Sequence, residues 1–253
     1  MILSTRLIFA TAYDIIRGMD GISNQIDLAL RRWYKSFGVD YVFHTVDSTV
    51  CNLPLQQLPQ RPLHEPFGTT LLNCETLNDL KEAVLGLDCP LKKMARNTVF
   101  SDGTPGADVM IIGEAPGQEE DTQGKPFVGQ SGQLLNNMLC AIGIRRQDVY
   151  ISNVVFWRPP GNRTPTSDEI SFCMPYMETH IKLAKPKALL LLGGVAVRTI
   201  LNTVEPIARI RGIVHTYHGI KVIATYHPAY LLRSPTQKHL VFQDLLLLKK
   251  TLR

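Results

Sequence analysis

The chain has 253 residues, of which 45% are hydrophobic and 19% charged, a composition typical of a soluble globular protein with one full-sized core. No apolar run reaches the roughly 18 residues that a membrane-spanning helix needs, so no membrane span is expected and no membrane partner is predicted. The formal net charge of +5 favours a polyanionic partner.

The first 21 residues, MILSTRLIFATAYDIIRGMDG, contain a short apolar run that superficially resembles a secretion signal. Thr11 interrupts this run, so we do not interpret it as a leader, and Met19 is an alternative start. The five cysteines are odd in number, widely spaced and without a CxxC pair, which argues against a disulfide framework. We therefore expect a cytoplasmic protein.

An N-terminal extension is expected over residues 1–68. Residues 24–39 have the spacing of a small amphipathic helix, with Trp33 among its apolar anchors. Residues 52–68 contain four prolines and little periodicity, which is typical of a linker. The pattern changes at Thr69, so we predict a separate domain over residues 69–253.

Continuous apolar runs alternate with helical patterns in the rest of the chain. The runs are ADVMIIGE (107–114), DVYISNVV (148–155), KALLLLGG (187–194) and KVIATYH (221–227). Helices are predicted over residues 75–87, 132–143, 167–184, 195–202 and 238–252. This alternation indicates an α/β fold whose parallel sheet is covered by helices on both faces.

Polar and aromatic side chains gather where three of these runs end. Glu114 ends the first run and is followed by Glu120 and Phe127, Asn153 lies near the end of the second, and His227 ends the fourth. Parallel α/β sheets bind ligands at the carboxyl ends of their strands, so we expect these residues to share one rim. A single His or Asn in such a place is usually structural, but the combination predicts a site.

The chemistry of this predicted rim suits a planar heterocycle. Asn153 offers a donor and an acceptor side by side, as a lactam edge requires. Phe127, set by the preceding proline, offers a face for stacking. His227 can donate to a carbonyl that gains negative charge. Together they indicate a pocket for a pyrimidine-like ring that leaves as an anion.

The loops beside this rim have features of a DNA-binding surface. Residues 156–165 and 225–235 are rich in proline and arginine, and backbone amides and arginines there could hold phosphates. Leu231 and Leu232 could wedge into a base stack. The candidate DNA-binding residues are Arg158, Asn162, Arg163, Tyr230, Leu231, Leu232 and Arg233.

Three segments, GEAPGQEEDTQGKPFVGQSGQLL (113–135), NVVFWRPPGNRTP (153–165) and TYHPAYLLRSP (225–235), resemble the motifs of family 4 uracil-DNA glycosylases, in the same order. The resemblance covers roughly residues 85–253. It implies a three-layer α/β/α fold with a central four-stranded parallel sheet. It also implies hydrolysis of the N-glycosidic bond of uracil in DNA, which leaves an abasic site during base excision repair.

The resemblance also implies a role for each motif residue. Phe127 would stack on the base, Asn153 would read its N3–O4 edge, and His227 would stabilise negative charge on O2. The implied uracil-binding residues, whose first three form the pocket floor, are Gly113, Glu114, Ala115, Phe127, Asn153 and His227.

Ala115 stands where the best-known glycosylases have an aspartate, so another group must position the attacking water. Glu114 and Glu120 are the candidates for this role. Their carboxylates would also stabilise an oxocarbenium-like sugar. The implied catalytic residues are therefore Glu114, Glu120, Asn153 and His227.

Members of the family usually ligate an iron–sulfur cluster with four cysteines, and this chain departs from that pattern. Gly86 and Trp157 occupy two of the four positions, while Cys89 and Cys173 occupy the others. Neither Gly nor Trp can bind iron. We therefore predict no cofactor, with Trp157 filling the space beside two reduced thiols.

None of the other cysteines is expected to replace a cluster ligand. Cys140 falls in an apolar helical pattern, where a buried and inert thiol is expected. Cys51 and Cys74 precede the core and would need to fold back onto it.

Two other functions compete with a monomeric repair enzyme. The first is a catalytically weak relative that binds nucleic acid or serves as a polymerase-associated subunit, although the complete base pocket argues against it. The second is an unrelated nucleotide-binding α/β protein. GEAPG is neither a dinucleotide fingerprint nor a phosphate loop with its lysine, so this alternative is disfavoured.

Overall fold

The computed structural model describes residues 74–252, and the expected N-terminal extension over residues 1–68 lies outside the described residues. In chain order the strands are β1 (Asp102–Gly103), β2 (Val109–Gly113), β3 (Tyr150–Asn153), β4 (Ala188–Leu192), β5 (Val214–Tyr217) and β6 (Ile220–Thr225). The α-helices are α3 (Leu77–Gly86), α4 (Pro90–Met94), α5 (Gln118–Gln123), α6 (Gln130–Ala141), α7 (Ser167–Ala184), α8 (Gly194–Leu201), α9 (Ile207–Ile210), α10 (Pro228–Arg233) and α11 (Lys238–Thr251). Short 3-10 turns are η2 (Arg146–Asp148), η3 (Pro160–Asn162) and η4 (Pro235–Gln237).

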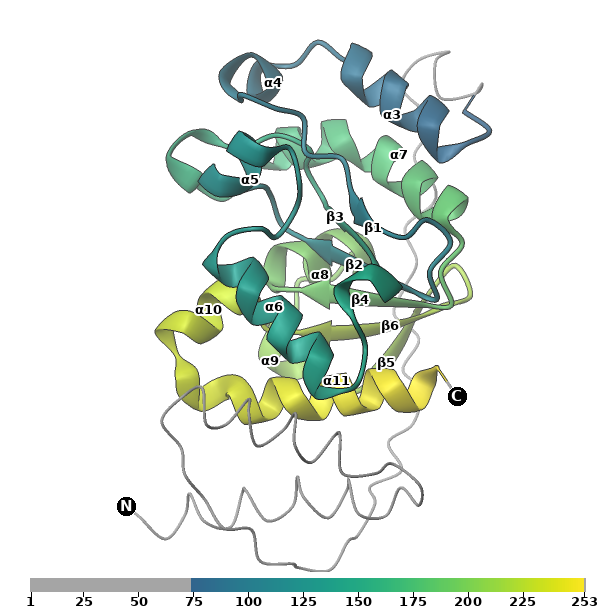
Figure 1. Ribbon diagram of the computed structural model, residues 1–253, viewed down its shortest axis with the longest axis vertical. Coiled ribbons are helices and arrows are strands. Elements are labelled where there is room, and N and C mark those ends of the chain that lie inside the picture. The colour runs from purple at the N-terminus through teal and green to yellow at the C-terminus, as the bar shows by residue number, and fades with distance from the viewer. Residues whose placement is uncertain (1–73, 253) are drawn as a thin grey trace, which may run out of the picture.

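The strands form a single mixed sheet in the order β1-β3-β2-β4-β6-β5 (Figure 1). The four inner strands run parallel, which confirms the predicted parallel core. The two edge strands are antiparallel and were not predicted. β1 has only two residues, and β5 (VHTY) lacks a continuous apolar run, so neither gives the pattern of a buried strand.

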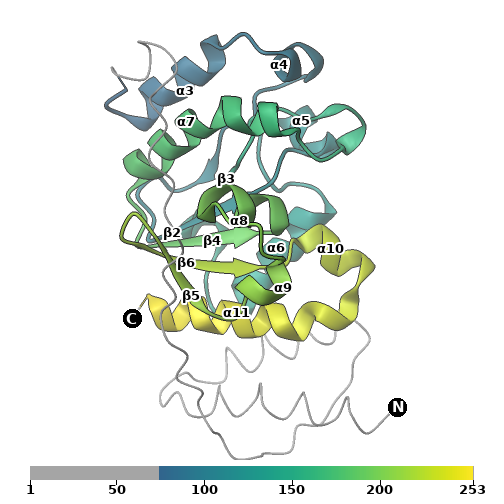
Figure 2. The ribbon, with the colours of Figure 1, turned by 180° about the vertical axis from the view of Figure 1, so that it is seen from behind.

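Helices cover both faces of the sheet, as the alternating pattern predicts. One face packs against α6, α10 and α11, and the other packs against α7 and α8, while α3 lies against α7 (Figures 1 and 2). Alternate residues of β2 point to opposite sides, so Met110 and Ile112 join one core cluster while Val109 and Ile111 join the other. The three-layer α/β/α architecture is therefore confirmed.

All five predicted helices are present, as α3, α6, α7, α8 and α11. The start of α7 is marked by a capping box. The Thr166 side chain accepts the backbone N–H of Glu169, and the Glu169 carboxylate accepts the backbone N–H of Thr166. The short helices α5 and α10 were missed, because six residues are too few for apolar periodicity.

The strand register places the motif residues together. Gly113 at the end of β2 pairs with Asn153 at the end of β3, and Leu192 at the end of β4 pairs with Thr225 at the end of β6. The carboxyl ends of all four parallel strands therefore meet at one edge, where ligands bind in such sheets. No helix within residues 74–252 is long and apolar enough to cross a membrane.

Candidate active site

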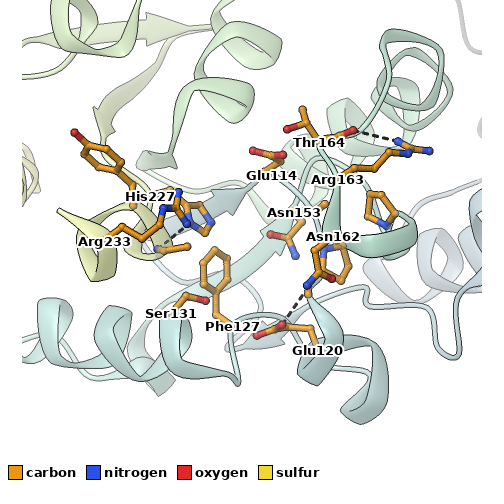
Figure 3. Close-up of a pocket in the computed structure, with 16 residues that line it drawn as sticks. Glu114, Glu120, Phe127, Ser131, Asn153, Asn162, Arg163, Thr164, His227 and Arg233 are labelled. Atoms are coloured by element: carbon orange, nitrogen blue, oxygen red, sulfur yellow. Dashed lines mark hydrogen bonds between the residues drawn. The ribbon is translucent and has the colours of Figure 1, made fainter.

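A cavity of about 470 Å³ opens at this edge (Figure 3). It brings together most of the predicted site residues: Glu114, Ala115, Glu120, Phe127, Asn153, Asn162, Arg163, His227, Tyr230 and Arg233. It also contains Ser131 and Thr164, which sequence reasoning missed because hydroxyl side chains in polar loops carry no distinctive pattern. Arg158, Leu231 and Leu232 do not line it.

Gly113 lies at the base of the cavity and allows Asn153 and Phe127 to pack closely against it. A Cβ atom at this position would overlap the Oδ1 atom of Asn153 and come within 2.7 Å of the Phe127 ring. Real Cβ atoms do not make such contacts, so any larger residue would displace the amide or the ring. The glycine of the first motif is therefore required by close packing under the pocket.

Asn153 presents an unsatisfied hydrogen-bonding atom at the cavity. The residue is buried, and its Oδ1 atom has no hydrogen-bond partner within residues 74–252. A buried polar atom without a partner is costly, so such an atom beside a cavity indicates that a ligand supplies the missing donor. A lactam N–H of a bound base is one such donor.

His227 is the N-cap of α10, and its orientation is fixed by the backbone. Its Nδ1 atom accepts the N–H of Ala229 at 3.1 Å, so the proton of the neutral ring resides on Nε2. Burial lowers the pKa of His227 to about 4; Glu120 opposes this shift, and the positive Arg233 supports it. The imidazole is therefore a neutral N–H donor at physiological pH. Its ring centroid lies 5.6 Å from that of Phe127 (Figure 3).

The two candidate carboxylates differ in their surroundings. Glu120 is buried, and its oxygens accept the backbone N–H groups of Gly117, Val128 and Gly129 at 2.8 to 3.1 Å. These bonds occupy both oxygens and give Glu120 a role in holding the surrounding loop.

Glu114 is half-buried and its carboxylate has fewer partners. Burial raises its pKa, although a hydrogen bond from Thr164 and the charge of Arg198 oppose the rise. Arg198, in α8, was not predicted because it lies far from the three motifs in sequence. Of the two carboxylates, Glu114 is therefore the better placed to contact a water or sugar.

The structure separates the two leucines that were predicted to wedge into DNA. Leu231 is fully buried in the core, so its assignment to the DNA-binding surface is wrong. Leu232 is 43% exposed, because consecutive residues of α10 point in different directions. Tyr230 is also exposed, and its ring packs against Tyr226 with centroids 5.1 Å apart.

The arginines beside the cavity are held by neighbouring side chains. Arg163 makes a two-pronged ion pair with Glu169, with nitrogen–oxygen distances of 2.6 and 2.8 Å. Arg158 donates to Oδ1 of Asn162 at 2.6 Å. These contacts hold both guanidinium groups in one orientation.

The region that corresponds to the cluster of the family does not fit four-thiolate ligation. Trp157 is fully buried there, and its indole N–H donates to Thr98 at 2.9 Å. Burial raises the pKa of Cys173 to about 12, and neighbouring Cys89 adds to this shift, so the thiol is protonated when no metal is bound. Within residues 74–252 no three His, Cys, Asp or Glu side chains are grouped to hold a metal.

Two other cysteine expectations are wrong. Cys140 is exposed, because it lies on the outer side of α6 and not on its apolar face. Cys74 packs at the edge of the same core cluster as Cys89 and Cys173, because α3 folds back against α7. Cys51 lies outside the described residues.

Comparison with known proteins identifies the family. The model of the uracil DNA glycosylase superfamily matches residues 100–247. A type-4 uracil-DNA glycosylase of Pyrobaculum aerophilum is 39% identical over 67% of this chain and 91% of its own length. The corresponding protein of Archaeoglobus fulgidus is 39% identical over 64% of this chain and 85% of its length. A DNA polymerase of Bacillus phage SP01 is 29% identical over 64% of this chain but only 18% of the polymerase. The chain therefore belongs to the uracil-DNA glycosylase superfamily.

Proposed function

We propose that this pocket removes uracil from DNA by hydrolysing its N-glycosidic bond, leaving an abasic site. The observation that carries the proposal is the buried Oδ1 atom of Asn153, which lacks a partner within residues 74–252 and lies beside Phe127 and near His227. The similarity to type-4 uracil-DNA glycosylases supports the same substrate.

Asn153 and Phe127 would recognise the base. The ring of Phe127 provides a stacking surface, and Oδ1 of Asn153 accepts the N3–H of uracil while its Nδ2 donates to O4. Cytosine has no proton on N3 and carries an amino group at position 4. It would leave Oδ1 unsatisfied, which is how a buried polar atom discriminates between similar ligands.

His227 would stabilise the departing base. As the bond between C1′ and N1 breaks, its electron pair stays on uracil and the charge spreads to O2. The Nε2–H of the neutral imidazole donates to this developing anion. A hydrogen bond to a group that gains charge strengthens in the transition state, so it accelerates the reaction and does not merely tighten binding.

Glu114 would act on the sugar and on the water. Its carboxylate stabilises the positive charge that develops on C1′ and orients the water whose oxygen bonds to that carbon. The proton released by this water passes to the carboxylate and then to solvent. Burial raises the pKa of Glu114, which makes it a better proton acceptor. Glu120, proposed from sequence for the same role, would instead act through the loop that it holds.

The surrounding surface would bind the DNA. Arg158, Arg163 and Arg233 would contact phosphates, and the exposed Leu232 would enter the space left by the flipped nucleotide. Removing a base from the stack costs a few kcal/mol, and these contacts would offset that cost.

We also propose that the enzyme folds and works as a cytoplasmic monomer without an iron–sulfur cluster. Gly86 and the buried Trp157, which stand at two of the four ligand positions and cannot bind iron, support the lack of a cluster. Cys89, Cys140 and Cys173 form no disulfide within residues 74–252, as expected in a reducing compartment.

An incision assay on uracil-containing oligonucleotides tests the proposal. Asn153→Ala and His227→Ala should each lower excision by about 10² or more, as loss of one preorganised donor does. Leu85→Ala, at an exposed position on α3, is the control. The similarity to a phage DNA polymerase favours one alternative, a polymerase-associated DNA-binding module. That alternative requires DNA binding without excision by the natural protein, and such a result would refute the enzymatic proposal.

A further inference from the structure

Phe127 adopts a backbone conformation that its own side chain disfavours. Its φ angle is +53°, in the left-handed region that bulky residues rarely occupy. Such conformations persist only where the surroundings impose them, and they cluster at functional sites. Phe127 is also the proposed stacking surface for uracil, so the groups that impose this conformation control the position of the base.

One restraint acts on the residues that follow Phe127. Oε1 of Glu120 accepts the N–H of Val128 at 2.8 Å and the N–H of Gly129 at 2.9 Å. Gly132, in the first turn of α6, packs against the backbone of Phe127, and a Cβ at Gly132 would overlap the Phe127 carbonyl. The segment is therefore held on its C-terminal side.

The other restraint is a single guanidinium outside the three sequence motifs. Nη1 of Arg146 donates to the carbonyl oxygen of Phe127 at 2.8 Å, and Nη2 donates to that of Pro126 at 2.6 Å. Nη1 also donates to Oδ1 of Asn136 at 3.1 Å. One rigid, planar group thus binds two consecutive carbonyls, which fixes the peptide between them.

Asp102 holds this guanidinium in place. Nε and Nη2 of Arg146 both lie 2.8 Å from Oδ2 of Asp102. Asp102 belongs to the edge strand β1 and pairs with Ile151 of β3, two residues before Asn153. The pair of Arg146 and Asp102, here called the clamp, therefore connects the Phe127 loop to strand β3, which carries Asn153. Both side chains are mostly shielded from solvent, which strengthens the interaction.

We infer that Arg146, oriented by Asp102, is a positioning residue that holds Phe127 in its strained conformation at the correct stacking distance from the base. The inference rests on the proposed function. Without the guanidinium, Phe127 relaxes toward negative φ and its ring leaves the plane that the uracil needs. Arg146 itself touches neither base nor sugar, because it lies behind the Phe127 backbone and does not line the cavity.

The test compares Arg146→Met with Arg145→Met in the full-length protein. Methionine keeps much of the side-chain length but removes every donor. Arg145 is the matched control, since it precedes the same turn, carries the same charge and pairs with Asp148 on the surface. We expect Arg146→Met to lower kcat/KM for a uracil oligonucleotide by about tenfold or more and to weaken inhibition by free uracil, while Arg145→Met does neither.

A double-mutant cycle separates positioning from a general structural role. In a Phe127→Ala background, Arg146→Met should cause little further loss, because the residue acts through the ring that is already missing. Arg146→Lys should recover part of the activity, since its ammonium keeps the charge and can donate to a carbonyl, but it lacks the planar fork that spans both carbonyls. If Arg146→Met folds poorly, Asp102→Asn gives a milder test of the same clamp and should weaken inhibition by uracil.

Two results would overturn the inference: unchanged kcat/KM and uracil inhibition in Arg146→Met, or losses that add in full to those of Phe127→Ala. In both cases the natural protein still excises uracil, so the proposed function would stand. A natural protein without excision would instead refute the proposed function itself.

Discussion

The backbone N–H of Ala229 donates to Nδ1 of His227, so the tautomer of the imidazole is set by the fold before substrate binds. An accepting nitrogen carries no proton, and the neutral ring therefore presents its N–H from Nε2. Because His227 is the N-cap of α10, the same contact caps the helix and orients the imidazole that is proposed to donate to the departing base. A change that removes this contact should therefore affect both the start of α10 and the orientation of the His227 imidazole.

The pH dependence of excision should reflect this neutral histidine. Since the pKa of His227 is lowered to about 4, chiefly by burial, kcat/KM should show no inflection near the ordinary value of about 6.5. The folded pKa lies below the unfolded one, so the stabilising contribution is complete above about pH 6.5 and is lost as the pH falls through about 4. NMR titration of the ring measures the pKa of His227, and a pH–rate profile shows whether kcat/KM has an inflection near pH 6.5.

A matched variant checks the electrostatic part of this assignment. Arg233 contributes to the low pKa of His227, so Arg233→Gln should raise that pKa. A titration of His227 near pH 6.5 in the natural protein would show that burial does not keep the ring neutral.

Gly113→Ala should impair catalysis through packing. The added methyl would overlap Oδ1 of Asn153 and the Phe127 ring, so both walls of the base pocket must shift. We expect kcat/KM to fall by about 10², the usual consequence of a displacement near 1 Å. Gly86→Ala is the control, because a Cβ there meets no atom of the described residues within 4 Å. Equal activity of the two variants would contradict the close packing of the pocket floor.

Leu231 and Leu232 should respond differently to the same substitution. Leu231→Ala removes a fully buried side chain and should lower the free energy of unfolding by about 2–5 kcal/mol. Leu232→Ala should leave stability within about 0.5 kcal/mol but lower excision from double-stranded DNA more than from single strands. Thermal unfolding and excision on both substrates test the pair. Similar effects of the two variants on stability would count against this division.

Much of the fold could be predicted because its main elements are long or strongly apolar. The four parallel strands are continuous runs such as ALLLL in β4, and α7 begins at a readable capping box. The edge strand β5 could not be recognised, since His and Thr interrupt it and its pairing with β6 depends on a tight turn at His218 and Gly219.

The site was predictable in part for a related reason. Residues at the ends of parallel strands must converge, which identifies Asn153 and His227 from sequence alone. Arg146 gave no such signal, because its contact with Phe127 joins residues 19 positions apart through a short 3-10 turn. Leu231 and Leu232 could not be distinguished, because the direction of a six-residue helix face depends on tertiary packing.

Trp157→Ala should destabilise the fold, because we propose that the indole fills the space that a metal cluster occupies in other members of the family. Trp157 is fully buried in a core cluster that contains Cys89 and Cys173. Truncation would leave a cavity that the surrounding side chains close only in part, so the free energy of unfolding should fall by about 3–5 kcal/mol. Phe172→Ala, at an exposed aromatic position of α7, should have a much smaller effect.

The thiols offer an independent measure of the same region. The pKa of Cys173 is raised to about 12 by burial, so this thiol should react slowly with alkylating reagents, whereas the exposed Cys140 should react faster. In Trp157→Ala, labelling of Cys173 should become faster because water reaches the cavity.

The natural protein should be colourless when purified without oxygen, with no thiolate–iron absorbance. Stoichiometric iron and acid-labile sulfide in that preparation would refute the idea that Trp157 replaces the cluster, even if the variant were destabilised as expected.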